Sequence, residues 1–281
     1  MIKISLPDFN RQEFEDFLLK GIDFDTGRPV ENEIELPSDK GIENYIRLGN
    51  EKYFFSFYKE ALSYYALVLK NNIQTIDAWV GQVRVLLDLG AYKSALYWSE
   101  RGIEILAPNP LLESLKALCL VYTGDNTKAI GIINRPVSDS DPPMLWLIRG
   151  EIFIRLKRFR HIFSRRRDIG PLGAFFSFLK ALEPNPRDGF MNQRIGIAYL
   201  QQHYLERSFE HLRLSLISAP QNPLTLYFLA EYYRQKKNYR YARFYAKKSI
   251  AFNPNLEVAI ELLQFLHSPV IRLREKLRSV I

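Results

Sequence analysis

Four histidines and one cysteine are the residues best suited to metal binding or nucleophilic catalysis in this chain. His161, His203, His211 and His267 lie far apart and show no spacing typical of metal ligands. The sequence also contains no glycine-rich phosphate-binding loop and no recognisable pair of nucleophile and base. This pattern favours a protein that is not an enzyme and that uses no metal or other cofactor.

The single cysteine, Cys119, lies in the apolar run LKALCLVY and is expected to be buried and reduced. One cysteine cannot form an internal disulfide, so nothing indicates an oxidising compartment. The N-terminal residues lack the apolar core of a signal peptide. No run of about 18 uncharged apolar residues predicts a transmembrane helix. We therefore expect a cytoplasmic protein.

Positive charge is concentrated in two segments of the 281-residue chain, which has a net charge of +8. These segments are RLKRFRHIFSRRR (155–167) and the basic amphipathic stretch 270–281. The residues of this predicted basic patch are Arg158, Arg160, Arg165, Arg166, Arg167, Arg272 and Arg274. Such clusters can bind phosphates or an anionic membrane surface, although most are simply solvated. Nucleic-acid or anionic-lipid binding is therefore the alternative to the function developed below.

Prolines, small residues and aromatic residues recur along the chain at a fixed interval. Pro220 and Pro254 lie 34 residues apart. A period of this length indicates repeated supersecondary units. The same spacing relates Gly196 to Ala230, Tyr199 to Tyr233, Gly90 to Gly124, and Ala61 to Ala95 and Ala129.

This pattern resembles the tetratricopeptide-repeat family over about six repeats and a closing helix, residues 42–268. The resemblance implies an all-α fold, a right-handed α-solenoid of stacked helix-turn-helix units. Stacking is required because one hairpin cannot bury its own apolar face. An acidic N-terminal arm is expected over 1–41 and a basic C-terminal helix over 269–281. The array is expected to be irregular over 131–175, where two insertions interrupt the period.

In this family the first helix of each unit lines a concave groove, and the resemblance implies which residues do so here. The implied groove residues are Leu111, Leu115, Leu118, Tyr122, Met144, Leu147, Ile148, Glu151, Ile154, Arg155, Phe190, Gln193, Arg194, Ile197, Leu200, Leu224, Tyr227, Phe228, Glu231 and Arg234. Together the apolar members are expected to expose about 500 Å², which soluble monomers rarely leave uncovered. The resemblance thus implies a scaffold, adaptor or assembly chaperone that binds an apolar or amphipathic segment of another protein.

Two alternatives to an open groove remain. Units three to five could pack tightly enough to fill it with their own side chains. The N-terminal arm could also dock onto it, because residues 1–43 carry eleven acidic and five basic residues together with Phe9, Phe14 and Phe17. Otherwise, this arm is an extra helix that caps the first repeat.

The segment 231–255 mixes tyrosines with lysines and arginines. In the repeat register, Tyr233, Tyr239, Ala242 and Ala246 fall on packing positions, so most of the tyrosines are expected to be at least partly buried. The basic residues fall on the turn or the outward face of the second helix. They are Lys236, Lys237, Arg240, Arg243, Lys247 and Lys248.

Overall fold

The computed structural model describes residues 22–23, 28–29, 39–106, 108–133, 138, 140–156 and 171–271. These residues are helical except for turns and one short antiparallel ladder between β1 (Ile22–Asp23) and β2 (Arg28–Pro29). The chain divides into two compact units, 1–136 and 137–281. The division lies within 131–175, the region whose sequence predicts an irregular array. The predicted boundaries of arm, array and terminal helix stay predictions.

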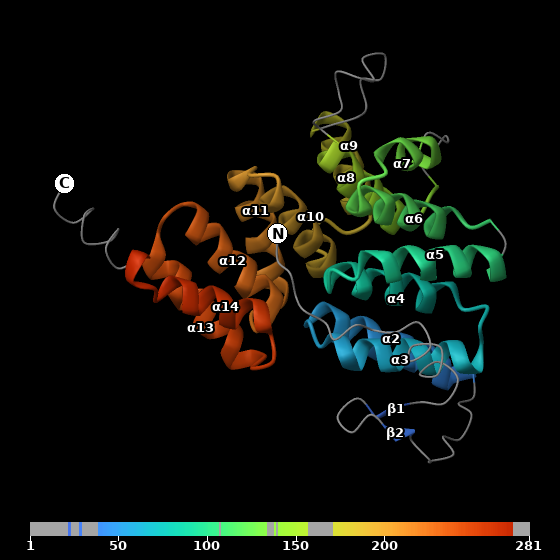
Figure 1. Cartoon of the computed structure of the whole chain (residues 1–281). Helices are drawn as coiled ribbons and strands as arrows, with labels where there is room; N and C mark the ends of the chain where they lie inside the picture. Colours follow the sequence, from blue (N-terminus) through green and yellow to red (C-terminus); the bar gives the residue numbers. More distant parts are fainter. Residues whose placement is uncertain are drawn as a thin grey trace. The chain divides into compact units, whose positions relative to one another are not determined.

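The first unit consists of helical hairpins, shown in blue to green in Figure 1. Each pair of helices is antiparallel, and each second helix also contacts the first helix of the following pair. First helices of successive pairs contact one another as well. The helices are α2 (Asp39–Phe54), α3 (Tyr58–Asn71), α4 (Ile76–Asp88), α5 (Tyr92–Leu106), α6 (Pro110–Thr123) and α7 (Asn126–Ile133).

The second unit repeats this arrangement and ends with an additional helix. Its pairs are α8–α9, α10–α11 and α12–α13, and α14 packs against both helices of the last pair. The helices are α8 (Pro143–Arg155), α9 (Pro171–Leu182), α10 (Gly189–Gln201), α11 (Leu205–Ser218), α12 (Pro223–Gln235), α13 (Tyr239–Phe252) and α14 (Glu257–Leu266). The prediction of an all-α array of stacked hairpins is confirmed for the described residues.

Asparagine and proline in the turns explain where several helices begin. The Asn109 side chain accepts hydrogen bonds from the backbone N–H groups of Leu111 and Leu112, and Pro110 opens α6. Asn222 accepts from the N–H of Thr225 at 2.9 Å, and Pro223 opens α12. Both asparagines satisfy backbone donors that a helix N-terminus leaves without a partner, and proline is tolerated there because it has no N–H to satisfy.

Glycine allows adjacent helices to approach closely, most of all at Gly81 and Gly150. A Cβ atom at Gly81 would lie 2.3 Å from Cζ of Tyr65, and one at Gly150 would lie 2.3 Å from Cε1 of Phe178. Real Cβ atoms do not come this close to another heavy atom, so each ring occupies space that only glycine leaves open. The small residues of the period are buried as well, namely Ala61, Ala95, Ala129, Ala230 and Ala242.

The core of the second unit is continuous from α10 to α14. Leu212 of α11 and Ala246 of α13 lie in it, fully buried. Leu262 and Leu266 of α14 belong to the same cluster, so this last helix covers the apolar face that the final pair would otherwise expose. The structure thereby explains why an apolar helix follows the last pair among the described residues.

Candidate partner-binding surface

Most apolar side chains of the implied groove in the second unit are buried. Their exposed fraction is 4% or less at Leu147, Ile148, Ile154, Ile197, Leu200, Leu224 and Tyr227. The last four belong to the continuous core of that unit. The expectation that these side chains form an exposed apolar patch is therefore wrong, because they pack within the core. Whether the implied residues bind a partner stays a prediction.

The implied groove residues of α6, in the first unit, follow the same trend. Leu115 and Leu118 are at most 2% exposed. Leu111 and Tyr122 are half-buried. Tyr122 stacks on Tyr92 with ring centres 4.7 Å apart. Because the Tyr122 ring is half-buried as well as stacked, it contributes mainly to packing.

The polar groove residues of α8 and α10 join these two helices. Glu151 and Arg194 form an ion pair, with 3.5 Å between Oε1 and Nε, and both side chains are at most 8% exposed. Arg155 donates to the Glu151 backbone oxygen at 2.8 Å and to Oε1 of Gln201 at 2.6 Å. Removal of one partner from a buried ion pair leaves an uncompensated charge, so these residues have a structural role.

A buried hydrogen-bond network fixes Gln193, another implied groove residue. Its amide nitrogen donates to Oδ1 of Asn222 and to Oγ1 of Thr225, both at 2.9 Å. Thr225 also lies 3.0 Å from the hydroxyl of Ser215. The network connects α10, α11 and α12, and a satisfied buried network of this kind specifies how helices pack.

An accessible surface adjoins the implied groove residues of α12. We call it the α12–α14 surface and define it as Phe228, Glu231, Arg234, Gln235 and Phe265. The Phe265 side chain is 46% exposed, and the Arg234 guanidinium lies 6.0 Å from its ring centre. Arg234 Nε donates to Oε2 of Glu231 at 2.6 Å. The surface therefore places an exposed aromatic ring beside a charged pair.

Phe265 is absent from the implied groove residues, although the sequence contains the signal that identifies it. It lies 34 residues after Glu231 and therefore occupies the equivalent position on the following first helix. The implied groove residues come from α6, α8, α10 and α12, and none of them lies on α14. Met144 and Phe190, which the resemblance does imply, are half-buried on α8 and α10.

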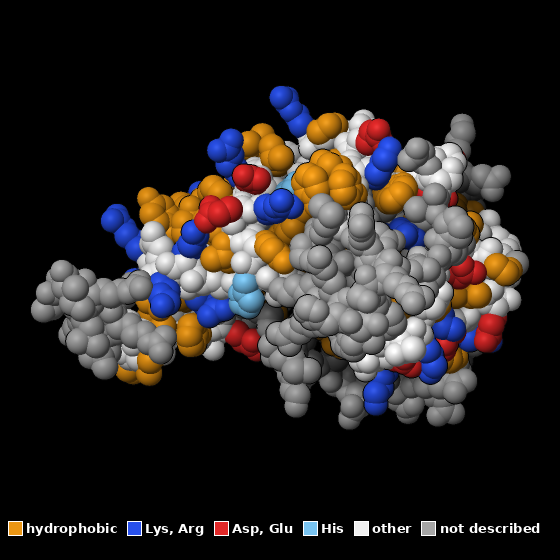
Figure 2. Space-filling model, turned by 90° about the horizontal axis from the view of Figure 1, so that it is seen from above, with side chains coloured by type: hydrophobic (Ala, Val, Ile, Leu, Met, Phe, Trp, Pro, Cys, Tyr) orange, Lys and Arg blue, Asp and Glu red, His pale blue; other side chains and the backbone are white. Residues whose placement is uncertain are grey.

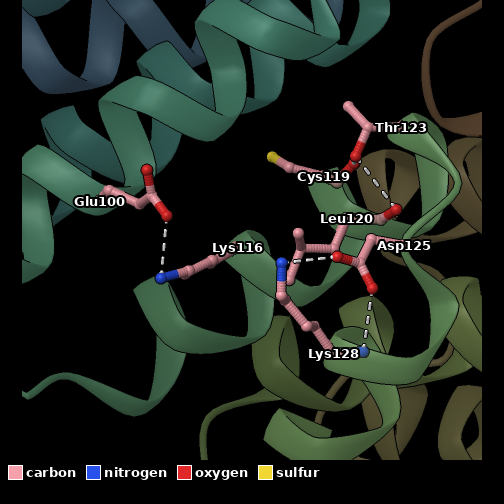
Figure 3. Close-up of polar contacts among 7 residues, drawn as sticks. All are labelled: Glu100, Lys116, Cys119, Leu120, Thr123, Asp125 and Lys128. Carbon is pink, nitrogen blue, oxygen red and sulfur yellow. Dashed lines mark hydrogen bonds and ion pairs between the residues drawn. The ribbon is translucent and has the colours of Figure 1, made fainter.

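Cys119 lies on α6, close to polar contacts among residues of α5, α6 and α7 (Figure 3). Burial raises the pKa of its thiol to about 12, so the thiol is protonated at neutral pH and is a poor nucleophile. Nearby, Lys116 pairs with Glu100 of α5 at 2.9 Å, and Lys128 of α7 pairs with Asp125 at 2.8 Å (Figure 3). The first contact connects α6 with α5, and the second lies at the beginning of α7.

The described histidines lie in separate places: His203 and His211 contact polar side chains, and His267 is exposed. His203 Nδ1 lies 3.0 Å from Oε1 of Gln235, and His211 Nδ1 lies 2.9 Å from Oδ1 of Asn192. Among the described residues, no three histidine, cysteine, aspartate or glutamate side chains lie close enough together to hold a metal ion. His161 lies outside the described residues.

Several predicted features fall outside the described residues. They are Arg158, Arg160, Arg165, Arg166, Arg167, Arg272 and Arg274 of the basic patch, and nearly all of the acidic arm. Within the described ranges, every helix is too short or too polar to cross a bilayer. On the face seen in Figure 2, exposed apolar side chains lie among charged ones.

Comparison with known proteins shows similarity in fold. No protein-family model matches the sequence, and no curated protein matches it either. A structure of human IFIT1, a dimer with PPP-AAAA, is similar over 85% of this chain and 55% of its own length, at 17% identity and a TM-score of 0.55. The present chain thus spans about half of the IFIT1 chain.

Two bacterial tetratricopeptide-repeat proteins are also similar. TTC0263 of Thermus thermophilus matches over 79% of this chain and 97% of its own length, at 18% identity and a TM-score of 0.44. A protein from Parabacteroides merdae matches over 83% and 87%, at 14% identity and a TM-score of 0.44. The likeness to the IFIT1 structure, together with the stacked helical pairs and their recurring small residues, shows that the described part of the chain has the fold of stacked helical hairpins that the repeat pattern predicts.

Proposed function

We propose that the chain is a non-enzymatic scaffold that binds a short amphipathic segment of a partner protein on the α12–α14 surface. The observation that carries this proposal is the 46% exposure of Phe265 on a helix whose other face lies in the core. The resemblance implies that first helices carry the binding groove in this family, and α12 and α14 are such helices. Roles as an adaptor or an assembly chaperone in the cytoplasm are both compatible with this binding mode.

The α12–α14 surface fits a segment with one apolar and one polar face. Phenylalanine can bury about 150–250 Å², so covering the exposed half of Phe265 contributes about 2 kcal/mol. An exposed ion pair contributes at most about 1 kcal/mol. The apolar contact should therefore dominate the affinity. Glu231 and Arg234 should determine the orientation of the segment, because they lie beside the ring.

Affinity capture from the host in which the chain is native tests this proposal. The full chain is immobilised as wild type and as the double variant Phe228→Ala with Phe265→Ala. We expect the wild type to retain a protein partner in high salt, because apolar contacts are not screened. The double variant should retain at least about tenfold less, the loss expected when about 1.4 kcal/mol of binding free energy is removed.

Phe252→Ala is the matched control, because Phe252 is 39% exposed and lies on α13, outside the α12–α14 surface. This variant should capture the partner as the wild type does. Circular dichroism should show equal helicity for all the proteins. Equal capture by the double variant and the wild type would contradict the proposed surface.

A further inference from the structure

The outward face of α13 combines exposed aromatic rings with positive charges. Tyr241 and Phe244 are 51% and 49% exposed. Arg240, Lys247 and Lys248 are also exposed, and none of the three takes part in an ion pair among the described residues. We call these five residues the α13 face. Large exposed rings and unpaired cations on a single helix are unusual for a surface that only meets water.

Helical periodicity places these five residues on the outward side of α13. Ala242, Ala246 and Ser249 are fully buried and form the opposite face, which packs in the core beside α12. Residues three or four positions apart lie on the same side of a helix, so Arg240, Phe244 and Lys247 or Lys248 line up along the outside. Tyr241 and Phe244 therefore lie on the solvent side of this helix, opposite its small inner residues.

Within the described residues, acidic side chains do not neutralise the α13 face. The sequence has no aspartate or glutamate from 232 to 256, a segment that contains six lysines and arginines besides Arg234. Glu231 is paired with Arg234, and Glu206 is paired with Lys236. On the adjacent α14, Glu257 and Glu261 are exposed and form no ion pair with this face. The face consequently offers a local excess of positive charge to an anionic partner.

The two exposed rings are held in place by their neighbours. Tyr241 stacks on Tyr233 with ring centres 5.1 Å apart, and Tyr233 stacks on Tyr245 at 5.4 Å. The ammonium of Lys248 lies 4.8 Å from the ring centre of Phe244. A ring that is already ordered loses little conformational entropy when another flat group stacks on it.

We propose that the α13 face binds single-stranded nucleic acid. Bases stack on Tyr241 and Phe244, and phosphates contact Arg240, Lys247 and Lys248. A single strand presents both flat bases and regularly spaced negative charges, so it uses every feature of this face. The bases of a duplex are already stacked on one another, and the carboxylate side chains of an acidic peptide offer no ring to cover Tyr241. This activity is separate from the proposed scaffold function and from the basic segments 155–167 and 270–281.

The dimensions of the face suit a short contact. Residues 240 to 248 span about 12 Å of helix at about 1.5 Å per residue. At about 3.4 Å per nucleotide this accommodates about four nucleotides. Nonspecific single-strand sites cover about 4–16 nucleotides, so the α13 face lies at the short end of that range. Binding should therefore be modest in affinity and sensitive to salt.

Fluorescence anisotropy with the full chain tests this proposal. The probes are fluorescein-labelled oligouridylate and oligothymidylate of equal length, together with a duplex of the same length, between about 50 and 200 mM salt. The triple variant Arg240→Gln, Lys247→Gln, Lys248→Gln should lower affinity and reduce the slope of log affinity against log salt by about 2. Tyr241→Ala and Phe244→Ala should each weaken binding about 5- to 100-fold and leave the slope unchanged.

The control for net charge is the triple variant Lys59→Gln, Lys70→Gln, Lys93→Gln, which removes three exposed charges from the first unit. Its affinity and salt slope should equal those of the wild type. A preference for either oligoribonucleotide or oligodeoxyribonucleotide supports the proposal, as does weaker binding of the duplex. Circular dichroism of every variant verifies that the helices are intact.

Three results would overturn the proposal. The first is the absence of oligonucleotide binding by the wild type at about 50 mM salt. The second is an equal loss of affinity in the charge control, which would show diffuse attraction to the whole protein. The third is wild-type affinity in both ring variants combined with equally strong competition by polyglutamate or phosphatidylserine vesicles. That result would assign the face to an acidic peptide or a membrane.

Discussion

His211 is a residue whose environment makes stability depend on pH. Its ring stacks on Tyr199 with centres 5.8 Å apart, and its Nδ1 lies 2.9 Å from Oδ1 of Asn192. Burial, with a smaller contribution from the Arg207 charge, lowers the pKa of His211 to about 4. An unfolded histidine titrates near about 6.5. Between these values the unfolded chain binds a proton that the folded chain does not, so stability falls as the pH falls.

We expect the free energy of unfolding to decrease by about 2.5 kcal/mol more between pH 7 and pH 4.5 in the wild type than in His211→Gln. Glutamine can donate a hydrogen bond but does not titrate. Urea denaturation at several pH values measures the difference. His203→Gln is the control for the loss of a histidine, because His203 lies in the same unit and is exposed. Parallel profiles for the wild type and His211→Gln would contradict the prediction.

At the scale of elements, the asparagines that cap α12 and α13 differ in the hydrogen bonds that they make. Asn222 is fully buried, caps α12 through the N–H of Thr225, and also accepts from the Gln193 side chain. Asn238 is exposed and caps α13 through a longer contact of 3.4 Å to the N–H of Tyr241. The same residue type at the same helix position therefore supports different amounts of structure.

Replacement of each asparagine by alanine should reveal this difference. Loss of a cap costs about 1 kcal/mol, and a buried donor without its acceptor costs about 1–3 kcal/mol. We expect Asn222→Ala to lower the free energy of unfolding by about 2–4 kcal/mol and Asn238→Ala by about 1 kcal/mol or less. Urea titrations monitored by circular dichroism would measure both. Equal losses would show that the buried network contributes nothing beyond the cap.

Most of the helices can be predicted from the sequence, but the exposure of their side chains to solvent cannot. The spacing of small residues identifies where helices approach closely, because glycine at position 150 leaves space for the Phe178 ring. The period also assigns Leu224 and Tyr227 to a first helix. The period does not reveal which element covers that helix. In the structure, both side chains belong to the same buried core as residues of α14. Phe265 and Tyr241 are exposed because other side chains, mainly alanines and leucines, occupy the buried faces of their helices.

At the scale of the whole molecule, the division at 136/137 determines how the chain should unfold. In stacked repeats each hairpin is stabilised mainly by its neighbours, so stability is a sum of local terms. The second unit has a continuous core from α10 to α14 and its own closing helix. The first unit has three pairs in contact with one another. Each unit therefore contains the neighbour contacts that its own helices need.

We expect residues 137–281, expressed alone, to be helical and to unfold in a single cooperative transition, because the core that includes Leu212, Leu262 and Leu266 lies entirely within them. Circular dichroism and urea titration of the fragment, compared with the full chain, provide the measurement. As a control, a fragment that ends at residue 256 lacks α14, leaves the apolar face of the last pair uncovered, and should be destabilised by several kcal/mol. A gradual, noncooperative transition in 137–281 would show that the second unit does not fold independently. It would also mean that mutational losses measured within this unit, such as that of Asn222→Ala, report on the entire chain.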